Sequence, residues 1–202
     1  MCPSNGGCTF LVSPDADPGN CPALWRPDLL GSVVLASIRE IHDILPTLPG
    51  RTCVDQILHG GRYIILNDVG GRHRIWLQSD AGSPDLTFHL PMDRSFALRS
   101  DATTRFARRC RGLTAGTRSP SLPSAFQRHR LTLMIRLADA EATGASLREL
   151  ARIVSPAMPA MSAAAWKASS ERRHIQRLRR ETAAMIAGGY RALLMGGDKK
   201  AR

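Results

Sequence analysis

The feature that most constrains the fold is a two-sided helical segment in the last third of the chain. On a helix of about 100° per residue, Ile175, Leu178 and Thr182 fall in one narrow arc, and Met185 and Ile186 extend it. The opposite arc is basic and consists of Arg173, Gln176, Arg177 and Arg180. Such a helix has to bury its apolar stripe against neighbouring helices, while its guanidinium groups remain in solvent.

Two more helices are predicted upstream of this basic one. Residues 126–142 are apolar nearly all round, which is typical of a helix inside a bundle. Gly144 breaks that pattern, and Ser146 with Glu149 forms a capping box for a short second helix. The third, basic helix then begins at Ser169 or Ser170. The expected core consists of Leu131, Leu133, Met134, Ile135, Leu137 and Ala138 from the first helix, and Leu147, Leu150, Ala151 and Val154 from the second.

The order of the three helices is that of a helix-turn-helix motif. The connection 155–167 contains Pro156 and Pro159 and exceeds the usual length of about three to four residues, so we expect a variant with its last two helices further apart. Trp166 offers a large apolar anchor in this connection. The side chains expected to hold the helices together are Leu147, Leu150, Trp166, Ile175 and Leu178.

Positive charge is concentrated in the same part of the chain. Of the net charge of +11, residues 126–202 carry +9 and residues 1–125 carry +2. Segregation on this scale indicates a polyanionic partner, and double-stranded DNA fits a recognition helix. A membrane partner is not expected, because the chain lacks an apolar run of about 18 residues and the basic helix is poor in Trp, Phe and Leu.

The basic helix therefore predicts two kinds of contact with DNA. Arginine and glutamine side chains on the outer face would read base edges in the major groove, and each bidentate arginine–guanine contact contributes about 1–3 kcal/mol of discrimination. Side chains around the start of the helix would bind phosphates. The expected base-reading residues are Arg173, Gln176, Arg177 and Arg180, and the expected phosphate contacts are Arg148, Lys167, Ser170, Arg172 and Arg179.

The first 125 residues read as a separate module. Asp68-Val69-Gly70-Gly71 separates two short strands, at 62–66 and 74–78, and predicts a β-hairpin. Further strands are expected at 33–36 and 86–90, followed by a helical region at 92–111. Four arginines near the end of that helix could extend a DNA surface, but we interpret them as a solvated helix end; they are Arg105, Arg108, Arg109 and Arg111.

These patterns together predict an α+β protein. A small N-terminal β-hairpin or sheet with a helix would be followed by an all-α, helix-turn-helix-type C-terminal domain. The expected organisation is an irregular segment at 1–24, an α+β module at 25–111, a Pro/Ser-rich linker at 112–124, a helix-turn-helix variant domain at 125–195 and a basic tail at 196–202.

The sequence shows no motif for catalysis or for a cofactor. It has no glycine-rich phosphate loop after a strand and no nucleophile elbow, and its six histidines are scattered without an acidic partner. Its five cysteines lack the spacing of a zinc site and are expected to be reduced. We expect a non-enzymatic protein without cofactor or metal, and the absence of a secretory signal places it in the cytoplasm.

Several short segments together carry a resemblance to a known family. The most specific is Gly188-Gly189-Tyr190-Arg191-Ala192-Leu193-Leu194, just after the basic helix. The segments 130–139, 144–151 and Ala165-Trp166-Lys167 also carry it, and a weaker likeness continues upstream at Trp25-Arg26-Pro27-Asp28 and 63–68. They resemble a proteobacterial family of regulators that control excision and transfer of integrative and conjugative elements. The helix-turn-helix variant domain of that family is otherwise of uncharacterised function.

The resemblance implies a DNA-binding transcriptional regulator of mobile-element genes. In that family the domain serves activators, which bind promoter DNA, and also small antiactivators, which bind an activator protein. A protein-binding antiactivator or partner subunit is therefore the alternative, and an RNA-binding or plasmid-replication accessory protein is a third reading. The additional N-terminal domain of fused activators is not found here, so the chain could act alone or with an upstream half. The oligomeric state stays open.

The final motif has a simple physical interpretation. Gly188-Gly189 is expected to end the basic helix and let the chain turn. Tyr190, Leu193 and Leu194 would then fold back as a closing apolar segment.

Overall fold

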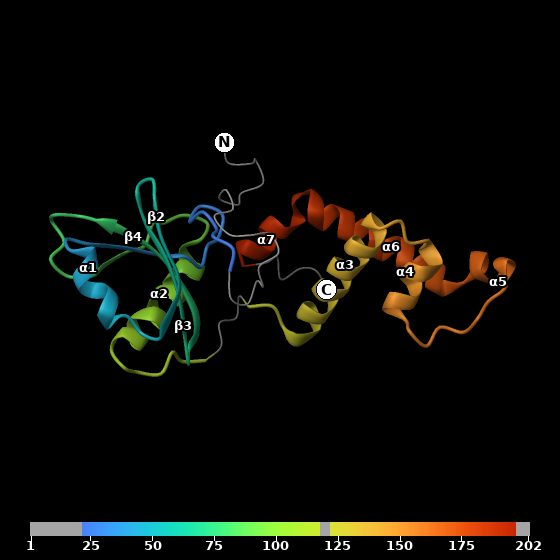
Figure 1. The fold of residues 1–202 in the computed structure, drawn as a ribbon, viewed down its shortest axis with the longest axis horizontal. Helices are drawn as coiled ribbons and strands as arrows, with labels where there is room; N and C mark the ends of the chain where they lie inside the picture. The colour runs from blue at the N-terminus through green and yellow to red at the C-terminus, as the bar shows by residue number, and fades with distance from the viewer. Residues whose placement is uncertain (1–21, 118–121, 197–202) are drawn as a thin grey trace. The chain divides into compact units, whose positions relative to one another are not determined.

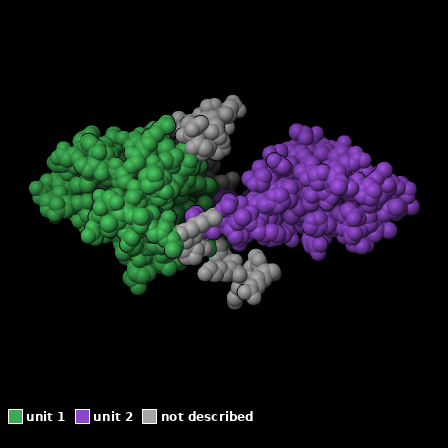
Figure 2. All heavy atoms as spheres, turned by 90° about the horizontal axis from the view of Figure 1, so that it is seen from below, with its two compact units in different colours: residues 1–121, 191–202 green, residues 122–190 purple. Residues whose placement is uncertain are grey.

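The computed structural model describes residues 22–117 and 122–196 of the chain. It contains two compact units, shown in Figure 2: residues 1–121 with 191–202, and residues 122–190. The predicted α+β class is confirmed, because strands with one long helix come first and a purely helical region follows. Residues 1–21 of the predicted irregular segment, 118–121 of the linker and 197–202 of the basic tail lie outside the described residues.

A five-stranded mixed sheet forms the centre of the first unit (Figure 1), with the strand order β2-β3-β4-β1-β5. β1 is parallel to β4, and the other neighbouring pairs are antiparallel. β3 and β4 form the predicted hairpin, whose register closes with Asp68 opposite Gly71. The strands are β1 Val34–Ile38, β2 Arg51–Leu58, β3 Gly61–Asp68, β4 Gly71–Ser79 and β5 Thr87–His89.

β2 is the strand that the sequence analysis missed. It pairs only with β3, at one edge of the sheet, and its register shifts between Thr52 and Val54 as in a β-bulge. Because an edge strand needs no continuous apolar run, the polar Asp55 and Gln56 are tolerated within it. A short helix, α1 (Ile41–Ile44), and a 3-10 turn, η1 (Leu45–Thr47), connect β1 to β2.

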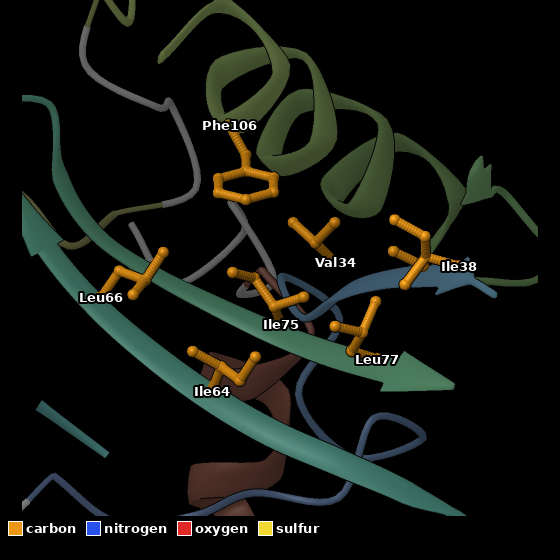
Figure 3. Packing of buried hydrophobic residues seen from close by; sticks show 8 residues of the cluster. Val34, Ile38, Ile64, Leu66, Ile75, Leu77 and Phe106 are labelled. Atoms are coloured by element: carbon orange, nitrogen blue, oxygen red, sulfur yellow. The ribbon is translucent and has the colours of Figure 1, made fainter. Parts of the chain in front are cut away.

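Helix α2 (Phe96–Cys110) packs on one face of the sheet, as Figure 3 shows. Its Phe106 side chain is fully buried and points at the aliphatic side chains of β1, β3 and β4. The opposite face buries Val33, Tyr63 and Ile65, so both faces of the sheet are covered. The core under α2 consists of Val34, Ala36, Ile38, Ile64, Leu66, Ile75, Leu77 and Phe106.

A buried carboxylate joins the end of α2 to the hairpin. The Asp68 side chain, 2% exposed, accepts hydrogen bonds from the Gly70 amide at 2.6 Å and from Arg109 Nε at 2.7 Å. His73 Nε2 lies 3.2 Å from the same carboxylate. Burial acts to raise the pKa of Asp68, but the hydrogen bonds from Arg109 and Gly70 outweigh it and lower the pKa. Burial also lowers the pKa of His73, although Asp68 opposes that shift.

The other arginines of α2 bind backbone carbonyls of the following segment. Arg105 donates to the carbonyls of Gly70, at 3.1 Å, and Thr117, and Arg108 Nε donates to the Thr114 carbonyl at 2.7 Å. The interpretation of a solvated helix end is therefore wrong for Arg105 and Arg109, because both are half-buried and hold the loop after α2 in place.

Three helices share one core in the second unit (Figure 1), and their order confirms the predicted arrangement. Ser124, Ser146 and Ser169 cap their N-termini, and the first two belong to capping boxes. A fourth, short helix lies in the long connection and was not predicted. The helices are α3 Ala125–Ala142, α4 Leu147–Val154, α5 Ala163–Ala168 and α6 Ser170–Ala184.

Some of the expected core residues are exposed instead. Met134 and Leu137 of α3 are 8% and 0% exposed, whereas Ile135 is 63% exposed. The prediction that α3 is surrounded by the bundle is therefore wrong, because α4 and α6 cover only one stripe of it. Ile186 is also exposed; it lies in η2 (Met185–Gly189), the segment in which the chain kinks at Gly188 after α6.

The chain turns at Gly188, as predicted, with a φ angle of +131° that favours glycine. The closing helix α7 (Tyr190–Leu194) follows. The Gly31 amide donates to the Leu194 carbonyl at 3.1 Å, which places the end of α7 in the first unit. Within residues 22–117 and 122–196, every helix is too short or too polar to span a lipid bilayer.

Candidate nucleic-acid interface

Helix α6 is held with its predicted apolar stripe facing the core. Ile175, Leu178 and Thr182 are 1%, 5% and 3% exposed, and they belong to the same core as Leu137 of α3 and Leu150 of α4. The helix begins where the sequence indicated, because the Ser169 hydroxyl accepts a hydrogen bond from the amide of residue 172 at 3.0 Å. Its orientation is therefore fixed by packing, as in other amphipathic helices.

The opposite face of α6 presents guanidinium groups to solvent. Arg173, Arg177 and Arg180 are exposed, and Gln176 is half-buried. Arg173 Nη1 donates to the Ala168 carbonyl at 3.1 Å, whereas Arg177 makes no hydrogen bond or ion pair with any described residue. Since each guanidinium has five donors, most of the donors on this face are available to a ligand.

Further polar groups surround the start of α6. Lys167 and Ser170 are exposed, and Arg172 is half-buried, with its Nη1 3.4 Å from the Lys167 carbonyl. The unpaired amides of a helix N-terminus favour anions, and these side chains add positive charge to it. Glu171 lies beside them, and its pKa is lowered by hydrogen bonds from its own backbone amide and from Ser170, so this carboxylate remains ionised.

Arg148 is placed differently from the other predicted phosphate contacts. Its guanidinium carbon lies 5.4 Å from the centre of the Trp166 ring, within the range of a cation–π interaction. Its Nη2 also donates to the Ser162 carbonyl at 3.3 Å. Arg148 thus connects α4 to the start of α5, a role that the sequence did not indicate.

Two ion pairs join α3 to α6, and neither was predicted. Arg179 pairs with Glu141, and Arg130 pairs with Glu181. The hydrogen bond from Arg179 lowers the pKa of Glu141, so the carboxylate remains ionised. The partners are 38 and 51 residues apart, so no local pattern could have revealed them.

Arg152 is an exposed basic residue that the prediction omitted. It lies four residues after Arg148, so the two share one side of α4. That i, i+4 spacing was present in the sequence and was the available signal. The predicted roles of the nine site residues in DNA binding stay predictions, although the structure places all nine in the helical unit.

A sequence model of one protein family matches residues 89–195, which is more than half of the chain. Its description is "T6SS, Transcription factor, DNA binding domain". The matched region begins at the end of β5 and includes α2 as well as the predicted helix-turn-helix domain. No curated protein matches the chain.

Proposed function

Because the chain belongs to the family of T6SS transcription-factor DNA-binding domains, we propose that it binds specific DNA sites through the major groove. The observation that carries this proposal is the orientation of α6. Ile175 and Leu178 are buried, and Arg173 and Arg177 are exposed on the other side of the same helix. A helix of this kind can pack by one face and present the other to base edges.

The proposed base contacts come from the middle of α6. Arg173, Gln176, Arg177 and Arg180 occupy its outer face, and a bidentate arginine–guanine contact would contribute about 1–3 kcal/mol of base discrimination. Arg177 is the strongest candidate, because its guanidinium has no intramolecular partner among the described residues. Arg180, by contrast, has its Nε 3.4 Å from the Gln176 carbonyl.

The proposed phosphate contacts surround the start of α6. Lys167, Ser170 and Arg172 are grouped there with the helix N-terminus. For Arg148 and Arg179 the phosphate role stays a prediction, since each also has an intramolecular partner. Each phosphate that is neutralised steepens the salt dependence of binding by about 0.9 in the log–log slope.

The regulated genes are a finer part of the proposal. The resemblance of the motif at 188–194 supports control of excision or transfer of an integrative and conjugative element. The description of the matched family names T6SS, so a T6SS promoter is the second candidate target. The proposed role needs no catalysis and no cofactor, and DNA as partner supports a location in the cytoplasm.

Exposed apolar side chains on the helical unit favour one alternative function. Phe126, Ile135 and Ile186 are 73%, 63% and 65% exposed, so each offers an apolar contact at the surface of the helical unit. An antiactivator or partner subunit would use such side chains to bind an activator protein. This alternative predicts weak DNA binding without sequence preference.

Selection of fragmented genomic DNA by the full-length protein, followed by sequencing, tests the proposal. We expect a few narrow peaks with a shared motif, and we expect Arg173→Ala/Arg177→Ala to lose them. The charge-matched control is Arg128→Ala/Arg136→Ala, which removes two exposed arginines from α3 and should keep the peaks. Diffuse recovery by the unmodified protein would contradict specific binding and favour the protein-binding alternative.

A further inference from the structure

Arg179 lies on α6 beside its buried stripe, on the side that faces α3. By helical position it is about 40° from the buried Ile175, and Arg180 is about 140° from it. Its guanidinium is turned toward α3, where Nη2 donates to the carboxylate of Glu141. Among the described residues, Arg179 is thus the basic residue of α6 that pairs with an acidic side chain of another helix.

The Glu141 carboxylate also lies close to residues that are proposed to read bases. An open hollow of about 460 Å³ is lined by side chains of α3 and α6. Gln176 and Arg180 are on its wall, together with both members of the ion pair. A negative charge is therefore fixed beside the basic face, where it would meet the phosphates of bound DNA. The lining residues are Glu141, Gln176, Arg179, Arg180 and Ala183.

The Arg179–Glu141 ion pair is expected to contribute little to the stability of the fold. The two side chains are 41% and 40% exposed, and exposed ion pairs contribute only about 0–1 kcal/mol. Moreover, Arg179 Nε is buried and has no hydrogen-bond acceptor among the described residues, which is unfavourable. The pair therefore requires an explanation other than a large contribution to folding.

We infer that Glu141 is a specificity-determining residue, which keeps Arg179 away from the DNA backbone and repels phosphate at the edge of the recognition face. This inference rests on the proposed function, but it replaces the phosphate contact predicted for Arg179. A free Arg179 would add a phosphate contact to every DNA sequence equally, and such contacts carry no sequence information. When Glu141 holds Arg179 in the ion pair, that phosphate contact is not made, and a larger share of the binding free energy comes from the base-reading residues.

The test compares Glu141→Gln with Glu181→Gln in the full-length protein. Both variants remove one negative charge from an α3–α6 ion pair of similar exposure, so a general charge effect cancels. We expect only Glu141→Gln to steepen the salt dependence on random-sequence DNA by about 0.9, which adds a three- to fourfold loss of affinity between about 50 and 200 mM salt. The ratio of specific to non-specific affinity should fall, and Arg179→Ala added to Glu141→Gln should restore it.

Three results would overturn the inference while the proposed function stands. In the first, Glu141→Gln behaves like Glu181→Gln. In the second, its effect persists when Arg179 is also replaced. In the third, Arg179→Ala alone lowers the slope by about 0.9, which would mean that Arg179 already contacts phosphate. Failure of the proposed function is recognised separately, because then Arg173→Ala/Arg177→Ala leaves DNA binding unchanged, and the inference fails with it. Thermal unfolding of each variant confirms that it is folded.

Discussion

Replacing Asp68 by asparagine tests whether the buried carboxylate helps to hold α2 on the hairpin. Asparagine keeps an oxygen for the Gly70 amide, but it turns an amide nitrogen toward Arg109 Nε, where the carboxylate accepted a 2.7 Å bond. One hydrogen bond to a charged group contributes about 1.5–3 kcal/mol. Arg109 is 18% exposed and keeps its bond to the Leu113 carbonyl, which limits the loss. We therefore expect Asp68→Asn to lower the free energy of unfolding of the first unit by about 2–3 kcal/mol.

Urea unfolding followed by tryptophan fluorescence measures this change. A Trp166→Phe background leaves Trp25 and Trp76, which both lie in the first unit, as the fluorescent reporters. The matched control is Asp55→Asn, because Asp55 is bonded to Arg62 in the same sheet but is 33% exposed, and we expect it to cost less than about 1 kcal/mol. Equal losses in the two variants would refute the reasoning that burial makes the Asp68 bonds important.

Two further predictions concern the helical core and the pH dependence of the first unit. Leu150 is 1% exposed in the helical core, so we expect Leu150→Ala to lower the free energy of unfolding by about 2–5 kcal/mol, as measured by thermal unfolding. Ile135 is exposed, so Ile135→Ala should lower it by less than about 0.5 kcal/mol. Similar losses in the two variants would contradict the described packing. Burial lowers the pKa of His73 below its ordinary value of 6.5, so the unfolded chain takes up a proton at a higher pH than the folded one. The stability that comes from the neutral, buried His73 is therefore complete above pH 6.5 and is lost as the pH falls below that value. Urea titrations from about pH 7.5 to 5.5 should show a steeper loss for the unmodified protein than for His73→Gln, and parallel curves would contradict the assignment.

Features encoded by neighbouring residues were predicted correctly. The hairpin follows from its turn at Asp68-Val69-Gly70-Gly71, because the turn chemistry is confined to four residues. The start of α4 follows from the Ser146–Glu149 capping box for the same reason. The buried stripe of α6 follows from helical periodicity, since it is a property of one element.

Features that depend on distant partners were missed. β2 mixes polar and apolar residues, because it lies at the edge of the sheet and pairs with β3 on one side only. Its place at the edge depends on the whole sheet and could not be inferred from its own residues. Ile135 was expected in the core because α3 is apolar on several sides, but burial depends on where α4 and α6 pack. For the candidate site, the basic face was predictable, whereas the engagement of Arg148 by Trp166 and of Arg179 by Glu141 was not.

The path of the chain has a consequence for how its parts can be separated and moved. The helical unit is an insertion, because the first unit contains residues on both sides of it and the Gly31–Leu194 hydrogen bond fastens the returning end. The helical unit is therefore joined to the first unit at both of its ends. Cleavage of the chain before the helical unit would not yield two complete units, since the downstream fragment would keep the end of α7, which belongs to the first unit.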